Sequence, residues 1–197
     1  MLNKISQKLA SHLIKNQIIS NEMFDLYVYG FELLLSFVFS TTILLLTGIL
    51  FKRIIETICF LIVFIFLRSF SGGYHALTYL FCTFVTLFVY GSVMLLSYYL
   101  SVKHIAFFVL LPLGIITLFI FAPIKNPNKK VSVKKAKQYK ITSICILAFF
   151  SIIGIIFHDR YPTLCNIVFY TLCADIILLF PKNQKKKGDV KNVCIPQ

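Results

Sequence analysis

The chain has 197 residues, of which 58% are hydrophobic and 14% charged, and its mean hydropathy is +0.85. A soluble domain of this length would not be so apolar, so the composition argues against a soluble fold and predicts several membrane-spanning helices. The net charge of +13 is confined to loops and termini, and no aromatic and basic surface motif accompanies it. This placement argues against nucleic-acid binding and favours contact with anionic membrane lipid.

Residues 1–22 are predicted to form an amphipathic helix that lies on the membrane surface. Apolar residues and lysines interleave in this segment, and no compact apolar stretch precedes a small-residue cleavage site, so a secretory signal is not expected. The apolar side would face lipid, and the lysines would lie among the headgroups. The lipid-facing residues would be Leu9, Leu13 and Ile14, and the headgroup-facing residues would be Lys4, Lys8 and Lys15.

Six apolar segments follow and are predicted to cross the membrane as helices. The expected fold class is therefore all-α, a polytopic integral membrane protein with one membrane domain over residues 1–180. The second segment is shorter than the ~20 residues that a bilayer core requires, so a re-entrant or tilted element is the alternative there. A basic, disordered tail is expected over residues 181–197. The spans are expected near residues 27–51, 54–67, 76–100, 105–124, 141–157 and 163–180.

The distribution of basic residues predicts the orientation of these six spans. With the N-terminus inside, sixteen of the 20 lysines and arginines fall in inner segments and four in outer loops. Cytoplasmic loops carry an excess of Lys and Arg, so both termini are expected in the cytoplasm. The same orientation places the polar stretch 68–75 on the cytoplasmic face.

That polar stretch, between the second and third spans, holds the first candidates for chemistry. Cys82 follows His75 by seven residues, and a cysteine nucleophile needs a base such as imidazole to form the thiolate. On a straight helix these residues would lie roughly 10.5 Å apart along the axis, too far for contact. The pair Gly72 and Gly73 would permit a bend that brings them together. The alternative is a membrane helix that happens to contain a cysteine, preceded by a loop histidine.

Three acidic residues lie in or beside apolar segments, where ionisable groups are functional candidates by default. Glu56 is expected to reach the membrane interface near the outer side. Glu32 and Asp175 fall toward the inner half or the middle, and each is a candidate to pair with Arg68 or with a lysine.

No metal or cofactor is expected from the cysteines and histidines of the chain. The six cysteines are scattered without a C-x-x-C pair, and five lie in or beside apolar runs, where a free cysteine behaves as a small hydrophobe. His104 and His158 fall in expected outer loops far from Cys82, and both are predicted to be solvated.

Two motifs resemble the accessory gene regulator B (AgrB) family. The first is Arg68-x-x-x-Gly72-Gly73-x-His75-Ala76 with Cys82 seven residues after the histidine. The second, Ala122-Pro-x-x-Asn-Pro-Asn-Lys129, is supportive, and it departs from the family in having Lys130 where a proline often follows. Length, hydropathy and the six-span arrangement fit the family along essentially the whole chain.

The resemblance implies a membrane cysteine endopeptidase that processes quorum-sensing peptide precursors in Gram-positive bacteria. Cys82 would be the nucleophile and His75 its general base. Arg68 would hold the precursor through paired hydrogen bonds, or it would instead mark the end of the second span by reaching the headgroups. Gly72 and Gly73 would admit the substrate backbone, or they would serve only as loop residues.

The family resemblance also implies partners and a location. The substrate would be a small AgrD-like precursor, cleaved through a Cys thioester and closed into a thiolactone ring. The lysines between residues 125 and 140 would bind anionic lipid, an acidic part of the precursor, or both. The protein would lie in the bacterial cell membrane with its active site toward the cytoplasm, and a homodimer is left open. The alternative function is a small membrane transporter or scaffold for peptide export without catalysis.

Overall fold

The computed structural model describes residues 2–71, 79–122 and 133–179, and all regular structure within these ranges is helical. The all-α prediction is confirmed for this part of the chain. The helices are α1 (Leu2–Lys15), the short 3-10 helix η1 (Asn21–Met23), α2 (Phe24–Leu50), α3 (Ile54–Ser71), α4 (Tyr79–Tyr99), α5 (Ile105–Phe121), α6 (Val133–Phe157) and α7 (Pro162–Leu178).

Three helical stretches are long and apolar enough to cross a membrane, by length and composition. They are Asn21–Leu50, Ile54–Ser71 and Lys134–Phe157. Three further apolar helices are shorter, namely Thr83–Tyr99, Ile105–Phe121 and Pro162–Leu178. The protein therefore has the apolar helices of a membrane protein, and six complete crossings with cytoplasmic termini stay a prediction.

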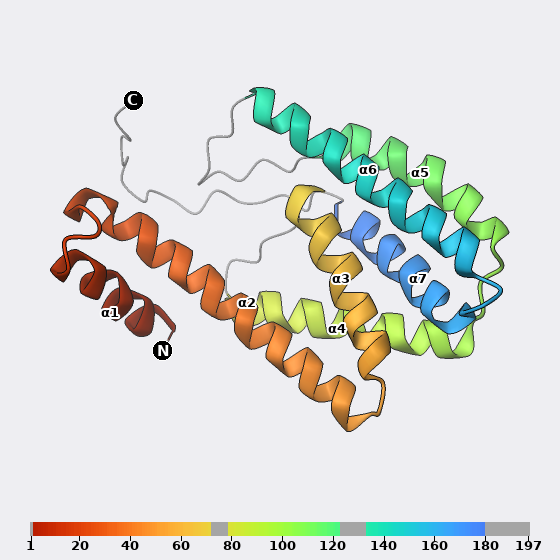
Figure 1. The fold of residues 1–197 in the computed structure, drawn as a ribbon, viewed down its shortest axis with the longest axis horizontal. Helices are drawn as coiled ribbons and strands as arrows, with labels where there is room; N and C mark the ends of the chain where they lie inside the picture. The colour runs from red at the N-terminus through yellow and green to blue at the C-terminus, as the bar shows by residue number, and fades with distance from the viewer. Residues whose placement is uncertain (1, 72–78, 123–132, 180–197) are drawn as a thin grey trace.

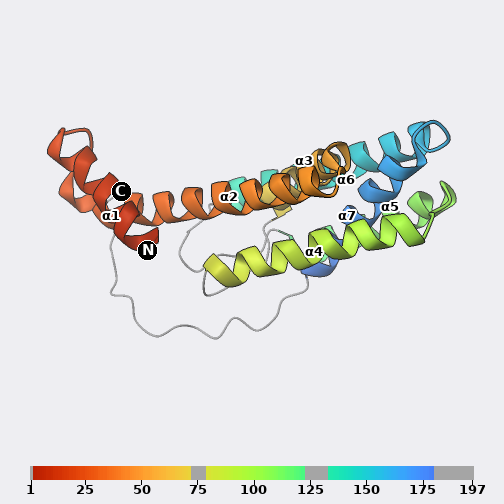
Figure 2. The same ribbon diagram turned by 90° about the horizontal axis from the view of Figure 1, so that it is seen from below.

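Helix α7 lies at the centre of the bundle and packs against α3, α4, α5 and α6 (Figure 1). Figure 2 shows α4 in a layer apart from α2 and α3. Helix α1 folds back on the first half of α2, and this pair projects away from the other helices (Figures 1 and 2). The central position of α7 explains why so many of its side chains are buried, including the polar residues Asn166, Thr171 and Asp175.

The N-terminal amphipathic segment forms α1 and uses its small residues to pack on α2. Ser6 and Ala10 are fully buried, whereas Leu9 remains 40% exposed. The amide of Asn3 donates a hydrogen bond of 2.6 Å to the carboxylate of Glu32 on α2. Glu32 therefore joins α1 to α2, which the sequence did not indicate.

Two helices extend beyond the apolar segments expected from the sequence. The segment expected to end at residue 67 continues as α3 through Arg68 to Ser71. The second half of the lysine-rich stretch 125–140 is helical, because α6 begins at Val133 rather than at the expected residue 141. Lysine and arginine are good helix formers, so a helix can continue past the end of its apolar segment.

Contacts between the helices give the bundle two distinct ends. At one end, where α3 ends and α6 begins, the rings of Phe70 and Tyr139 lie 6.2 Å apart between centroids. We call this the Arg68 end. At the other, the His158 end, His158 donates a hydrogen bond to the carbonyl of Val102, just after α4. The 21 residues of α4 form about 30 Å of helix, so its first turn lies far from the His158 end.

A glycine allows α2 and α3 to approach each other closely beside their connection. A Cβ atom added at Gly48 would meet the side chain of Thr57, including its Cβ atom at 2.9 Å. Thr57 is fully buried, and its hydroxyl contacts the Tyr90 hydroxyl at 2.7 Å and donates to the Arg53 carbonyl at 2.8 Å. A branched side chain held by two hydrogen bonds has little freedom to move aside.

We therefore expect Gly48→Ala to destabilise the protein by about 1–3 kcal/mol, the usual cost of overpacking. Gly30→Ala in the same helix is the matched control, because nothing lies within 4 Å of its added Cβ. It should leave stability unchanged or raise it slightly, since Ala favours helix over Gly by about 1 kcal/mol. Thermal unfolding in detergent would check both variants, and equal midpoints for the two would contradict the close packing.

Candidate functional site

The structure describes two of the five predicted site residues, and these lie on two successive helices. Arg68 lies in the last turn of α3. Cys82 belongs to α4, and its backbone lies three residues after the first residue of that helix. Gly72, Gly73 and His75 lie outside the described residues. The predicted bend between His75 and Cys82 therefore stays a prediction, and regular helix is described only from Tyr79 onward.

Two side chains of α4, Thr83 and Tyr90, hold this helix against α2 and α3. The hydroxyl of Thr83, which is 7% exposed, lies 2.8 Å from the hydroxyl of Ser40 on α2. Two turns further, Tyr90 contacts the hydroxyl of Thr57 on α3. Both contacts join polar side chains inside an apolar bundle, where loss of such a hydrogen bond costs free energy. The helix that carries Cys82 is thus held in position from α2 and α3.

Arg68 is positioned by groups on its own helix and on α7. Its guanidinium carbon lies 5.1 Å from the centroid of the Phe64 ring, one turn earlier on α3. Asp175 on α7 is only 4% exposed, and Arg68 is the charged group that acts on it electrostatically. Within the described part of the chain, the Oδ2 atom of Asp175 has no hydrogen-bond partner. A buried acid beside a cation is a functional candidate, because such groups are costly to retain in an apolar bundle.

The sequence predicted Asp175 only as one of several candidates for pairing. The packing of α7 against α3 brings Asp175 within electrostatic range of Arg68, although these two described residues form no ion pair. The other two acids have different partners. Glu56 forms an ion pair of 3.0 Å with Arg53 in the first turn of α3, and Glu32 accepts its hydrogen bond from α1.

A basic surface lies at the same end of the bundle, on the first turns of α6. Lys134, Lys135 and Lys137 are exposed, and none of them forms an ion pair with another described residue. Lys140 instead donates a hydrogen bond of 2.7 Å to the carbonyl of Phe119 near the end of α5. A cation suits that position because the last carbonyls of a helix carry partial negative charge. The three free lysines give the Arg68 end a positive surface suited to acidic groups.

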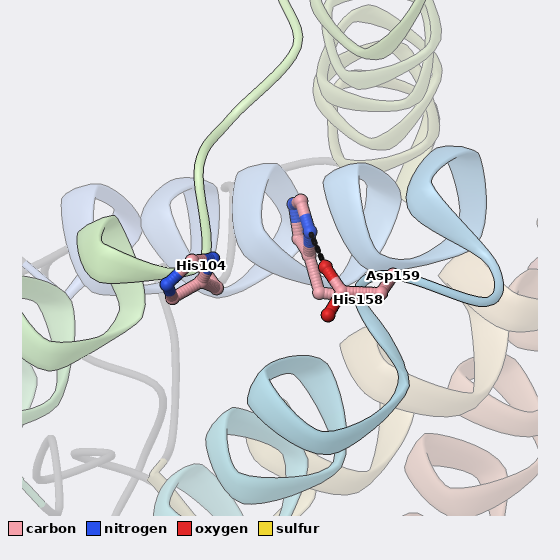
Figure 3. A group of neighbouring side chains, drawn as sticks. All are labelled: His104, His158 and Asp159. Carbon is pink, nitrogen blue, oxygen red and sulfur yellow. Dashed lines mark ion pairs between the residues drawn. The ribbon is translucent and has the colours of Figure 1, made fainter.

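The prediction that both outer histidines are solvated is wrong for His158. The side chain of His158 is only 15% exposed, and it lies beside His104 with 5.9 Å between the ring centroids. His104, His158 and Asp159 gather at the His158 end (Figure 3), away from Arg68. Sequence spacing could not show this cluster, because the two histidines lie 54 positions apart in the chain.

Comparisons with known proteins bear on the whole chain. The sequence profile of the accessory gene regulator B family matches residues 6–179. AgrB-like protein 2 of Clostridium perfringens (strain 13) is 26% identical over 164 residues, covering 79% of this chain and 77% of the relative. An AgrB-like protein of Clostridium perfringens (strain SM101) is 28% identical over 182 residues, covering 88% of this chain and 83% of the relative.

A third relative carries the family name itself. Accessory gene regulator protein B of Staphylococcus saprophyticus is 22% identical over 135 residues, covering 68% of this chain and 71% of that protein. No solved structure matches the chain. Because the family profile extends over nearly all the described helices, the chain belongs to the accessory gene regulator B family.

Proposed function

We propose that this protein is a membrane-embedded cysteine endopeptidase of accessory gene regulator quorum sensing, with Cys82 as nucleophile and His75 as general base. The observation that carries the proposal is the Arg68-x-x-x-Gly72-Gly73-x-His75 motif with Cys82 seven residues later, in a chain that belongs to this family. The substrate is a small AgrD-like precursor peptide.

In the first step, the Cys82 thiolate attacks the carbonyl carbon of the scissile peptide bond. His75 takes the thiol proton and then gives it to the leaving amine, so the C-terminal fragment departs and a thioester remains on Cys82. Trading a peptide for a thioester is uphill, so removal of the released fragment draws this step forward.

In the second step, His75 takes the proton of a cysteine thiol within the retained fragment, and this thiol attacks the thioester carbonyl. The new thioester closes a thiolactone ring, and Cys82 leaves as a thiol with the proton that His75 took from the attacking group. One thioester replaces another, so this exchange is nearly balanced in free energy and needs no nucleotide. A site that excludes water would limit the competing hydrolysis of the Cys82 thioester.

The described residues support this proposal by the charges that they place at the Arg68 end. Arg68 would bind carboxylates or carbonyls of the precursor, and the buried Asp175 would hold the guanidinium in position. The exposed lysines Lys134, Lys135 and Lys137 would attract an acidic segment of the precursor and anionic lipid headgroups. We place this end at the cytoplasmic face of the bacterial cell membrane, because basic residues collect there.

The alternative is a small peptide transporter or scaffold in which Cys82 has no chemical part. A transporter commonly has broken helices in two related halves. In the described residues of this chain, each helix of the bundle is continuous. The enzyme is therefore the better-supported function.

We expect co-expression with the precursor to release a C-terminal fragment that mass spectrometry detects. The Cys82→Ala and Cys82→Ser variants should leave the precursor intact, because neither side chain supplies a thiolate. Cys145→Ala is a matched control on α6 whose side chain is exposed, and it should process the precursor as the unmodified protein does. Cleavage that persists in both Cys82 variants would support the transporter or scaffold instead.

A separate expectation concerns Asp175. The change Asp175→Asn keeps the shape of the side chain but removes the acidic group beside Arg68, so the guanidinium should lose its fixed position. Processing should fall by about tenfold to a hundredfold, the scale on which misplaced groups slow catalysis. Asp25→Asn, an exposed acid in the first turn of α2, is the control and should leave the rate unchanged. The positioning role would be wrong if Asp175→Asn and Asp25→Asn process the precursor equally fast.

A further inference from the structure

The His158 end contains a side-chain cluster that the proposed peptidase does not use. One ligand atom each from His104, His158 and Asp159 lies within 4.8 Å of the other two. His104 immediately precedes α5, whereas His158 and Asp159 immediately follow α6, so two separate connections meet here (Figure 3). Two imidazoles and one carboxylate are the donor set that Zn²⁺ and related divalent metals prefer.

The hydrogen bond of His158 indicates which of its two ring nitrogens carries the hydrogen. Its Nε2 atom contacts the backbone carbonyl of Val102, and because a carbonyl only accepts, Nε2 must carry the hydrogen. In neutral imidazole the lone pair is then on Nδ1. A histidine that binds a metal usually donates its other N–H to a carbonyl or a carboxylate in this way, which fixes the tautomer and the ring orientation.

The lone pair of His158 faces another acceptor across a gap. Its Nδ1 atom lies 3.7 Å from Oδ1 of Asp159, too far for a hydrogen bond. Two ligands of one tetrahedral Zn²⁺ ion, each bound at about 2.0–2.1 Å, lie roughly 3.4 Å apart. The observed separation therefore fits two groups that share a cation after a small adjustment. Asp159 can make it freely, because its side chain is 98% exposed.

The backbone beside His104 is held in place before any metal binds. The N–H of Val102 donates to the Asn166 side chain at 3.1 Å, and Tyr170 donates to the carbonyl of Leu100 at 3.1 Å. Both partners lie on α7, the central helix. The connection before α5 is thus fixed against α7, and only the exposed side chains of His104 and Asp159 have to turn toward the ion.

We propose that His104, His158 and Asp159 form a binding site for a divalent transition metal of the Zn²⁺ class, with water completing the tetrahedron. The ion joins the α4–α5 connection to the α6–α7 connection and stabilises this end of the bundle. Lys103 and Arg160 flank the ligands in the sequence, but both are exposed, so water screens their charges. The site is separate from Cys82 and independent of the proposed peptidase.

The test is a Zn²⁺ titration of the purified protein in detergent against a chromophoric chelator, with all thiols alkylated so that cysteines cannot bind the ion. We expect one Zn²⁺ per chain at micromolar concentration. His104→Ala and Asp159→Asn should each weaken binding at least tenfold. His12→Ala on α1, a histidine outside the cluster, is the matched control and should bind as the unmodified protein does. No binding below millimolar Zn²⁺, or equal binding by Asp159→Asn and His12→Ala, would overturn the proposal.

Thermal unfolding separates metal binding from a purely structural role. Without metal, Asp159→Asn and the unmodified protein should unfold at the same temperature, because the carboxylate is exposed. Free Zn²⁺ at ten times the dissociation constant should shift the unfolding equilibrium of the unmodified protein about elevenfold toward the folded state. Asp159→Asn should show a much smaller shift. A rise of the same size in both proteins would place the ion elsewhere and contradict the site.

Discussion

Polar groups on the central helix α7 are the constraint on which the arrangement of the other helices depends. Asn166 and Tyr170 hold the connection between α4 and α5, and Asp175 lies beside the cation of α3. Apolar packing alone does not choose one orientation in a bundle surrounded by lipid, because lipid and core are equally apolar. Buried polar groups favour one arrangement of the helices, since each polar group left without its partner costs free energy.

This constraint gives the two ends of the bundle different chemistry. The Arg68 end combines a buried acid with a cation and the exposed lysines of α6, which suits the recognition of acidic groups. The His158 end combines two histidines and an acid on connections fixed by hydrogen bonds. The proposed catalysis and the proposed metal site therefore lie at opposite ends of the same helices and can be tested independently.

Hydropathy alone predicted the all-α class, because an apolar chain in lipid must satisfy its backbone hydrogen bonds within helices. It did not predict where α3 and α6 stop and start, since charged residues such as Arg68 and Lys134 continue a helix beyond its apolar part. The motif around Cys82 was visible as a local pattern. The approach of Asp175 to Arg68 and the meeting of His104 with His158 were not visible, because they depend on how distant helices pack.

The most direct test of the central claim, that Cys82 carries the acyl group of the cleaved precursor, is to trap that thioester. The purified protein would be incubated with a precursor whose ring-forming cysteine is replaced by alanine, so that the second step cannot occur, and then analysed by intact-mass spectrometry. We expect an adduct with the mass of the N-terminal fragment, located on Cys82 and removed by hydroxylamine. Release of the C-terminal fragment with no adduct, or with the adduct on another cysteine, would contradict the account.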